Sequence, residues 1–220
     1  MKLLVLGGTG RSGRWVLKYA LEAGHETVAL VRSPQKLLIR SPLLSVVSGT
    51  PERATDVLRA LDGCEAVVST LNNSRASDLP WARVVSPPMF MTRSIGNVIS
   101  AMHTKGSRRI VVLSAVGVGD SFAYAPAITK LLIPRTNLHV VFEDHAAQEA
   151  ALRKSALDWT CVRAAILTNR RFSGKLVVSY EGRPKPHLTV SRARAARFMV
   201  DILNDPAFFG KAPVISERWF

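Results

Sequence analysis

The chain has 220 residues, 47% of them hydrophobic and 21% charged, a composition that excludes a mostly disordered chain and suits an α/β domain. The 30 lysines and arginines against 16 acids give a net charge of +14, but the basic residues are scattered. We therefore expect a basic solvated surface that also attracts anionic cofactors, and nucleic-acid binding is disfavoured. No apolar run reaches the roughly 18 residues of a membrane span, and the first apolar run is too short for a secretory signal. The two cysteines, Cys64 and Cys161, are far apart and lie in apolar surroundings, so we expect a reduced cytoplasmic protein, with a disulfide as the alternative.

Apolar runs alternate with amphipathic stretches along the chain, which is typical of a parallel sheet covered by helices. Strands are predicted at 3–6, 27–31, 44–47, 66–69, 110–114 and 159–163. Helices are predicted at 14–23, 53–61, 90–105 and 142–154, and Gly24, Gly63 and Gly106 end the first three. This order predicts an α/β fold with a Rossmann-type doubly wound parallel sheet, in a single domain, 1–220, with a small C-terminal extension.

The predicted extension begins with a β-hairpin, 175–180 with 187–190, around Gly182-Arg183-Pro184. Ser191 is predicted to cap a helix that runs to about 203, and a last strand is predicted at 212–215. Three less regular stretches, about 72–88, 117–138 and 164–190, are predicted to form the substrate side.

A glycine-rich turn, Gly7-Gly8-Thr9-Gly10-Arg11-Ser12-Gly13, follows the first predicted strand and precedes the first helix. Glycine permits a tight turn, a close backbone approach to phosphates and close packing of helix on strand, and the helix start adds free N–H groups. The sequence therefore predicts that residues of this turn bind a pyrophosphate, namely Gly7, Thr9, Gly10, Arg11, Ser12 and Gly13.

The second predicted strand ends at Arg32, without a carboxylate in reach. An acid at this point binds the ribose 2′-hydroxyl of NAD, whereas a guanidinium matches a 2′-phosphate. The cofactor is therefore predicted to be NADP(H). The alternative is that Arg32 is an ordinary surface residue of a basic protein.

The motif GGTGRSG, together with VALVRSPQK, RSIGNVISAM, VVLSAVG and EDHAAQEAALRKSALDWTCVR, resembles the atypical short-chain dehydrogenase/reductases of the NAD(P)H-binding, NmrA-like type. The nearest resemblance is to the flavin reductase/biliverdin-IXβ reductase branch, and it covers nearly the whole chain. It implies further cofactor contacts at Thr50, Ser69, Thr70, Leu71, Ser114, Ala165 and Ile166. The chain departs from the family's common Gly-Asp and Arg-Pro pairs at Thr50 and Ala164.

The Tyr-x-x-x-Lys motif of typical short-chain dehydrogenases is missing, because Val141 and His145 stand at its two positions. A mechanism that needs an acidic phenol is therefore disfavoured. Ser114 is predicted to donate a hydrogen bond to the carboxamide or the acceptor, with a strand-end cap as the alternative. His145 is a candidate proton donor or phosphate-side contact, with a structural histidine as the alternative.

A conjugated acceptor needs the least help from such a site, because it delocalises the incoming charge and takes its proton from water. We therefore predict an NADPH-dependent reductase of a flavin, quinone or tetrapyrrole, with Trp81 and Tyr124 lining the acceptor pocket. Surface packing is the alternative for Trp81. No His, Cys or Asp set has metal-ligand spacing, and we expect a monomer or homodimer. A non-catalytic NADP(H)-sensing regulator is the main alternative function, and sugar-nucleotide epimerase or isoflavone-type reductase chemistry is a weaker one.

Overall fold

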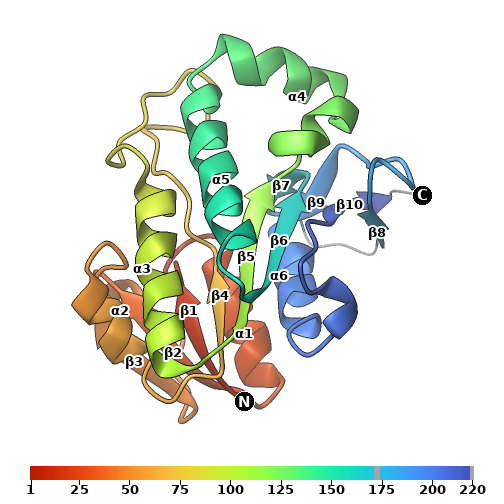
Figure 1. Ribbon diagram of the computed structural model, residues 1–220. Coiled ribbons are helices and arrows are strands. Elements are labelled where there is room, and N and C mark those ends of the chain that lie inside the picture. The colour runs from red at the N-terminus through yellow and green to blue at the C-terminus, as the bar shows by residue number, and fades with distance from the viewer. Residues whose placement is uncertain (171–173, 219–220) are drawn as a thin grey trace.

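A computed structural model describes residues 1–170 and 174–218 of the chain (Figure 1). Residues 171–173 of the predicted substrate-side stretch 164–190 lie outside the described part. The last two residues of the predicted domain, 219–220, lie outside it as well.

The main sheet has eight strands in the order β3-β2-β1-β4-β5-β6-β10-β8. All neighbouring strands are parallel except β10 and β8, which are antiparallel. The strands are β1 (Lys2–Leu6), β2 (Glu26–Val31), β3 (Leu44–Ser48), β4 (Ala66–Ser69), β5 (Arg109–Ala115), β6 (Asp158–Ala164), β8 (Lys175–Ser179) and β10 (Val214–Arg218). The predicted Rossmann-type sheet is confirmed, with each of the first six predicted strands within one residue of its observed bounds.

Helices cover both faces of this sheet (Figure 1). One face packs on α1 (Gly13–Glu22) and α6 (Arg192–Asp201), and the other packs on α2 (Ala54–Ala60), α3 (Phe90–Lys105) and α5 (Leu138–Arg153). Strand β1 is buried on both sides, since its side chains alternate between the two cores that these helices close. In the described residues, no helix is both long enough and apolar enough to span a membrane.

The chain reverses its direction across the sheet between β1 and β4. From β1 it moves outward to β2 and β3, and it then returns to β4 on the other side of β1. In open sheets of this kind, ligands bind beyond the carboxyl ends of the two strands at such a switch point. The glycine-rich turn follows β1 at this place.

The predicted hairpin at 175–180 and 187–190 is wrong. Strand β8 pairs instead with β10 along five residues, from Lys175 opposite Arg218 to Ser179 opposite Val214. Strand β9 (Thr189–Ser191) pairs in parallel with β7 (Ile166–Thr168), a strand that was not predicted. Turn residues indicate where a chain reverses, but they do not decide which strand it then joins, and both segments pair with other strands.

The helices also differ from the prediction in one boundary and in several short pieces that were not predicted. Helix α5 begins at Leu138, four residues earlier than expected. The irregular stretch 117–138 contains three short helical pieces, η2 (Gly119–Tyr124), α4 (Ala127–Leu132) and η3 (Ile133–Arg135). Short 3-10 turns are also present at η1 (Pro34–Lys36) and η4 (Pro206–Phe208). The predicted Ser191 cap is confirmed, because the Arg194 backbone N–H donates to its hydroxyl at 3.1 Å.

Candidate functional site

The glycine-rich turn is so tight that side chains are excluded at two of its positions. Gly7 has a φ of +78°, in the left-handed region that favours glycine. A Cβ placed on Gly13 would lie 2.0 Å from the Gly7 carbonyl oxygen, so α1 packs directly on the turn. The Gly10 N–H closes the turn by donating to that same oxygen at 2.8 Å. The predicted turn geometry is therefore present.

A cleft of about 410 Å³ opens over this turn, at the switch point of the sheet. Its wall contains eight predicted cofactor residues, namely Gly7, Thr9, Gly10, Arg11, Ser12, Arg32, Thr70 and Leu71. We call it the cofactor cleft. Helix α1 begins at the cleft with no side chain capping it. The Arg14 and Trp15 N–H groups donate to Gly10 and Ser12 within the turn, and the positive end of the helix dipole at the cleft favours an anion.

Four arginines line the cofactor cleft: Arg11, Arg32, Arg75 and Arg192. Asp78 is the acidic residue among the lining residues, and it accepts two hydrogen bonds from Arg11 at 2.6 and 2.7 Å. The Arg11 guanidinium holds the pKa of the Asp78 carboxyl below its usual range, with smaller contributions from Arg192 and Arg75. The excess of positive charge suits a ligand with several phosphates.

An orphaned buried atom lies in the same cleft. Asn73 is buried and donates from Nδ2 to Asp144 at 3.0 Å, while its Oδ1 has no hydrogen-bond partner. A buried amide oxygen without a partner costs free energy unless a ligand or water supplies a donor. A dinucleotide fits three features of this cleft: a turn with no room for side chains at Gly7 and Gly13, the four arginines, and the free Asn73 Oδ1 acceptor.

A second cavity of about 390 Å³ adjoins the cofactor cleft, and we call it the acceptor cavity. Eight lining residues are common to both spaces: Arg11, Leu71, Asn72, Arg75, Asp78, Leu113, Leu167 and Arg192. Its far wall is mostly apolar and comes from α4, η3 and the start of α5, with Ile128, Leu132, Ile133, Leu138 and Phe142. The predicted residues Ser114, His145, Ala165 and Ile166 line it as well. The two spaces form one continuous site.

Ser114 lines the acceptor cavity, but its hydroxyl hydrogen points toward Glu149 and not into the cavity. The hydroxyl donates to Glu149 Oε1 at 2.7 Å, and Glu149 is buried against Arg163 with an N–O distance of 2.7 Å. A carboxylate paired with a guanidinium accepts and does not donate. The predicted donor role of Ser114 is therefore corrected: its proton is committed to Glu149, and only its oxygen lone pairs remain for a ligand.

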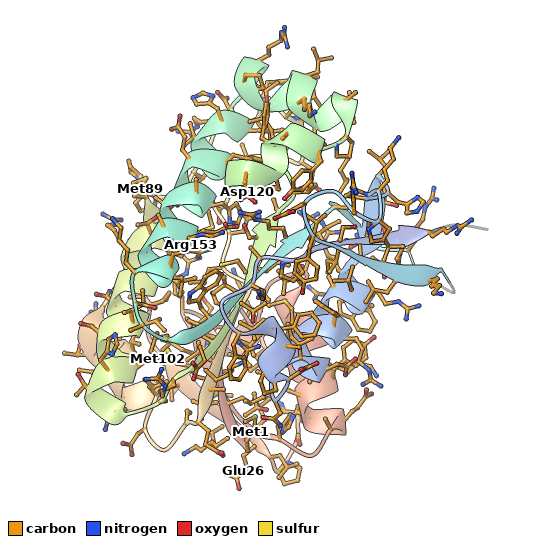
Figure 2. All side chains as sticks on the ribbon, turned by 45° about the vertical axis from the view of Figure 1, so that its right-hand side comes forward. Met1, Glu26, Met89, Met102, Asp120 and Arg153 are labelled. Carbon is orange, nitrogen blue, oxygen red and sulfur yellow. The ribbon has the colours of Figure 1, made fainter. Side chains whose placement is uncertain are left out.

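The Glu149–Arg163 pair extends to the protein surface on the side away from the acceptor cavity. Arg163 also donates to Asp120 at 2.7 Å, and this bond lowers the pKa of the Asp120 carboxyl. Arg153 lies 3.8 Å from Glu149, and Figure 2 labels it with Asp120 on the same side of the molecule. This network fixes Ser114 from behind. The sequence had indicated Glu149 only as part of a family segment.

His145 lines the acceptor cavity as a neutral group. The residue is buried on α5, its Nδ1 has no hydrogen-bond partner, and burial lowers the pKa of its imidazole to about 4. At neutral pH the ring therefore carries no extra proton to give away. The geometry disfavours the predicted proton-donor role and leaves His145 as a neutral hydrogen-bonding group.

Three predicted cofactor-binding residues line neither the cofactor cleft nor the acceptor cavity. Gly13 is packed under the turn, Ser69 is buried with its hydroxyl accepting from the Leu71 N–H, and the Thr50 N–H donates to Asp56. Next to Thr50, Pro51 lines the cofactor cleft.

The two aromatic residues predicted to line the acceptor pocket, Trp81 and Tyr124, do not line the acceptor cavity. Trp81 is 63% exposed, and its carbonyl accepts from the Asn137 side chain. Tyr124 packs on Gly182, and its hydroxyl bonds Asp120 at 3.3 Å. The aromatic ring that does line the acceptor cavity is Phe142. Only its position on α5 places it there, so spacing offered no signal for it.

Within residues 1–170 and 174–218, no cluster of three or more His, Cys, Asp or Glu side chains is arranged to hold a metal ion. The two cysteines, Cys64 and Cys161, are buried and unpaired.

Known proteins resemble this chain in sequence and in fold. The photosystem II assembly factor Ycf39 of Synechocystis is 30% identical over 121 residues, which cover 54% of this chain but only 35% of the assembly factor. A solved anaerobillin reductase, ChuY, from Escherichia coli O157:H7 has a TM-score of 0.80 at 20% identity, over 100% of this chain and 98% of that one. A short-chain dehydrogenase/reductase from Veillonella parvula, solved with NADP, has a TM-score of 0.78 at 18% identity, over 98% and 94%.

These two structural likenesses concern the fold alone. A family model described as NAD(P)H-binding matches residues 7–206, from the glycine-rich turn to the end of α6 and beyond. The match includes every residue that lines the cofactor cleft and the acceptor cavity. It confirms the resemblance at family level, and the chain belongs to the NAD(P)H-binding family.

Proposed function

We propose that this protein is an NADPH-dependent reductase that transfers hydride to a conjugated, planar acceptor such as a flavin, quinone or tetrapyrrole. The observation that carries the proposal is the continuity of the cofactor cleft with an apolar cavity whose described lining residues include no tyrosine and no lysine. Reduction of a simple carbonyl needs such an acid at the reacting oxygen, whereas a conjugated acceptor spreads the charge over its rings.

Each part of the site has a role in this reaction. The amides of the glycine-rich turn bind the pyrophosphate, and Arg32 binds the 2′-phosphate, since a guanidinium offers paired donors to phosphate oxygens. When bound, the reduced nicotinamide supplies the hydride. Ser114 accepts a hydrogen bond from the carboxamide, because its own hydroxyl hydrogen is already donated to Glu149. The acceptor ring packs on Phe142 and Ile128, and its proton comes from water.

The experiment measures NADPH oxidation by the purified protein with FMN, riboflavin, a quinone and a tetrapyrrole as acceptors. We expect turnover with at least one of them. If NADPH binds tightly but none of these acceptors is reduced, the proposed function is wrong and the second candidate, an NADP(H)-sensing regulator, takes its place. The described lining residues of the cavity include no tyrosine or lysine, and burial lowers the pKa of His145; this favours the alternative.

The choice of cofactor is tested at Arg32. We expect Arg32→Gln to raise the KM for NADPH by roughly tenfold or more, and to leave the KM for NADH nearly unchanged, because a charge-assisted phosphate contact is lost. Lys154→Gln is the matched control, since it removes an exposed positive charge that lines neither space. Equal effects of Arg32→Gln on both cofactors would contradict the role of Arg32.

A further inference from the structure

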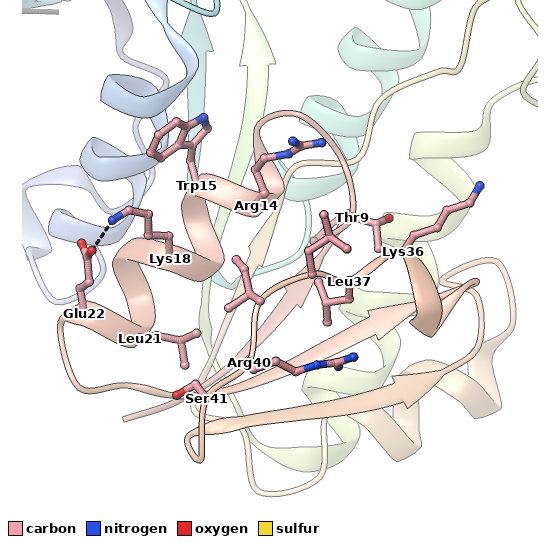
Figure 3. A pocket seen from close by; sticks show the side chains of 13 residues that line it. Thr9, Arg14, Trp15, Lys18, Leu21, Glu22, Lys36, Leu37, Arg40 and Ser41 are labelled. Atoms are coloured by element: carbon pink, nitrogen blue, oxygen red, sulfur yellow. Dashed lines mark hydrogen bonds and ion pairs between the residues drawn. The ribbon is translucent and has the colours of Figure 1, made fainter. Parts of the chain in front are cut away.

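A third cavity lies beside the glycine-rich turn, between α1 and the segment 36–41 (Figure 3). Its volume is about 520 Å³, which is larger than the cofactor cleft at about 410 Å³. Thr9 is the one residue that lines both of these spaces in the described chain. We call this space the α1 groove. Its volume falls in the range of small-molecule pockets, about 300–1,000 Å³.

The floor of the α1 groove is apolar. Leu21 of α1 and Leu37 of the facing segment line it (Figure 3), and Ile39 is also a lining residue. Leu38, beside them, has 85% of its surface exposed. Contiguous apolar surface that a chain leaves open to water, with polar groups at its edge, is typical of a binding site.

The rim of the groove is positively charged. Arg14, Lys36 and Arg40 line it, and no ion pair to an acidic side chain is recorded for any of the three within residues 1–170 and 174–218. The remaining cation, Lys18, is neutralised by Glu22 at 2.5 Å. Figure 3 shows the three unpaired cations on the side away from this ion pair. The groove thus has an apolar floor with unpaired cations along its rim.

We propose that the α1 groove binds a free amphipathic anion, a single-chain carboxylate of the fatty-acid type. Its head group lies at the cationic rim, to which Arg14, Lys36 and Arg40 contribute, and its chain lies on Leu21 and Leu37. Charge complementarity requires an anion, and the apolar floor requires a hydrocarbon tail. The 13 residues that line the groove are fewer than the roughly 20–30 per side of a stable protein interface, which favours a small molecule. The inference is independent of the proposed reductase activity.

The test is calorimetric titration of dodecanoate, below its micelle concentration, into the full-length protein in the presence of saturating NADP⁺. We expect binding at a single site. Acetate, which lacks the tail, and dodecyltrimethylammonium, which has the opposite charge, should not bind. Loss of dodecanoate binding when NADP⁺ is added would place the ligand in the cofactor cleft and overturn the proposal. If NADP⁺ itself fails to bind, the proposed function fails and the dodecanoate titration remains interpretable.

Two variants locate the site. Arg40→Glu reverses a charge on the exposed rim, and Leu21→Gln removes part of the floor; we expect each to weaken dodecanoate binding by roughly tenfold. Lys154→Gln, which removes a distant surface charge, should leave the affinity unchanged. Circular dichroism verifies that each variant is folded, and the surface variant Arg40→Glu decides the case if Leu21→Gln unfolds. Equal weakening in Lys154→Gln, no effect of Arg40→Glu, or binding only to phosphatidylglycerol vesicles would overturn the proposal.

Discussion

His145 illustrates how burial changes the chemistry of a single side chain. Histidine in water titrates near neutrality and is a common proton donor. On α5 the imidazole is enclosed, with Phe142 edge-on at a ring distance of 6.5 Å, and desolvation disfavours its charged form more than Glu149 and Asp144 favour it. The result is a neutral ring in the wall of the acceptor cavity. Its titration then affects the stability of the fold more than the reaction.

The stability of the protein is therefore expected to depend on His145 at acidic pH. Its pKa is about 4 in the folded protein and about 6.5 when unfolded, so the unfolded state takes up the proton first. This contribution is complete above pH 6.5 and is lost as the pH falls toward 4, by roughly 3 kcal/mol in all. We expect His145→Gln to lose less free energy of unfolding between pH 7 and 4, as measured by urea denaturation.

The exposed histidine His103, near the end of α3, is the matched control. His103→Gln should keep the acid sensitivity of the wild-type protein. If His145→Gln and the wild type lose stability in parallel across this range, the neutral, buried state of His145 is wrong.

The start of α3 shows how one element is completed by another. Its first residue follows Met89, which has a left-handed backbone and provides no side-chain cap. The cap comes from Asp144 on α5, whose carboxylate accepts from the Met91 and Thr92 N–H groups at 2.9 Å each. A carboxylate at a helix N-terminus satisfies free donors and complements the dipole. Asp144 also holds Asn73, so the same residue ties the cofactor cleft to two helices.

The loop 72–88 contacts the glycine-rich turn through Asp78 and Arg11, where a phosphate is expected to bind. Both side chains are more than half exposed, so we expect the pair to contribute little to stability but to compete with the cofactor. Asp78→Asn should therefore bind NADPH about two- to fivefold more tightly in fluorescence titrations. Asp62→Asn, which breaks the surface pair with Lys105, should have no effect. Unchanged or weaker binding in Asp78→Asn would show that Asp78 does not oppose the cofactor.

Over the whole molecule, part of the net charge of +14 is concentrated at two places. Four arginines line the cofactor cleft, and three unpaired cations line the rim of the α1 groove. Long-range attraction of an anionic ligand by such a surface is screened by salt, with a Debye length of about 10 Å at 0.1 M. The basic composition therefore serves ligand binding at two separate places.

Cofactor affinity should accordingly fall with ionic strength, and more steeply for NADPH than for NADH, because NADPH carries the additional 2′-phosphate. Calorimetric titrations of both cofactors at about 0.05 and 0.5 M KCl measure the two slopes. Parallel slopes would mean that the 2′-phosphate does not interact with protein charge.

Much of the fold follows from local patterns. The apolar runs of β1, β2, β4, β5 and β6 read as strands because both faces of each are buried, whereas β3 is an edge strand without a buried residue. Gly24 and Gly106 stop their helices because each adopts a positive φ. The glycine-rich turn is also predictable locally, since the hydrogen bond that closes it joins Gly10 to Gly7. The hairpin failed for the opposite reason: β8 and β9 are paired by strands β10 and β7, which lie more than 20 residues away.

By itself, the sequence determined the doubly wound sheet, the glycine-rich turn and the position of Arg32, because each depends on hydrophobic period or on backbone freedom within a short segment. Only the tertiary structure decided the site's chemistry. It shows that the Ser114 hydroxyl donates a hydrogen bond to Glu149 and that burial keeps His145 neutral. It also shows that Phe142 lines the acceptor cavity while Trp81 and Tyr124 do not. A side chain's proton and its neighbours are set by groups brought together from distant parts of the chain, and no local pattern contains that information.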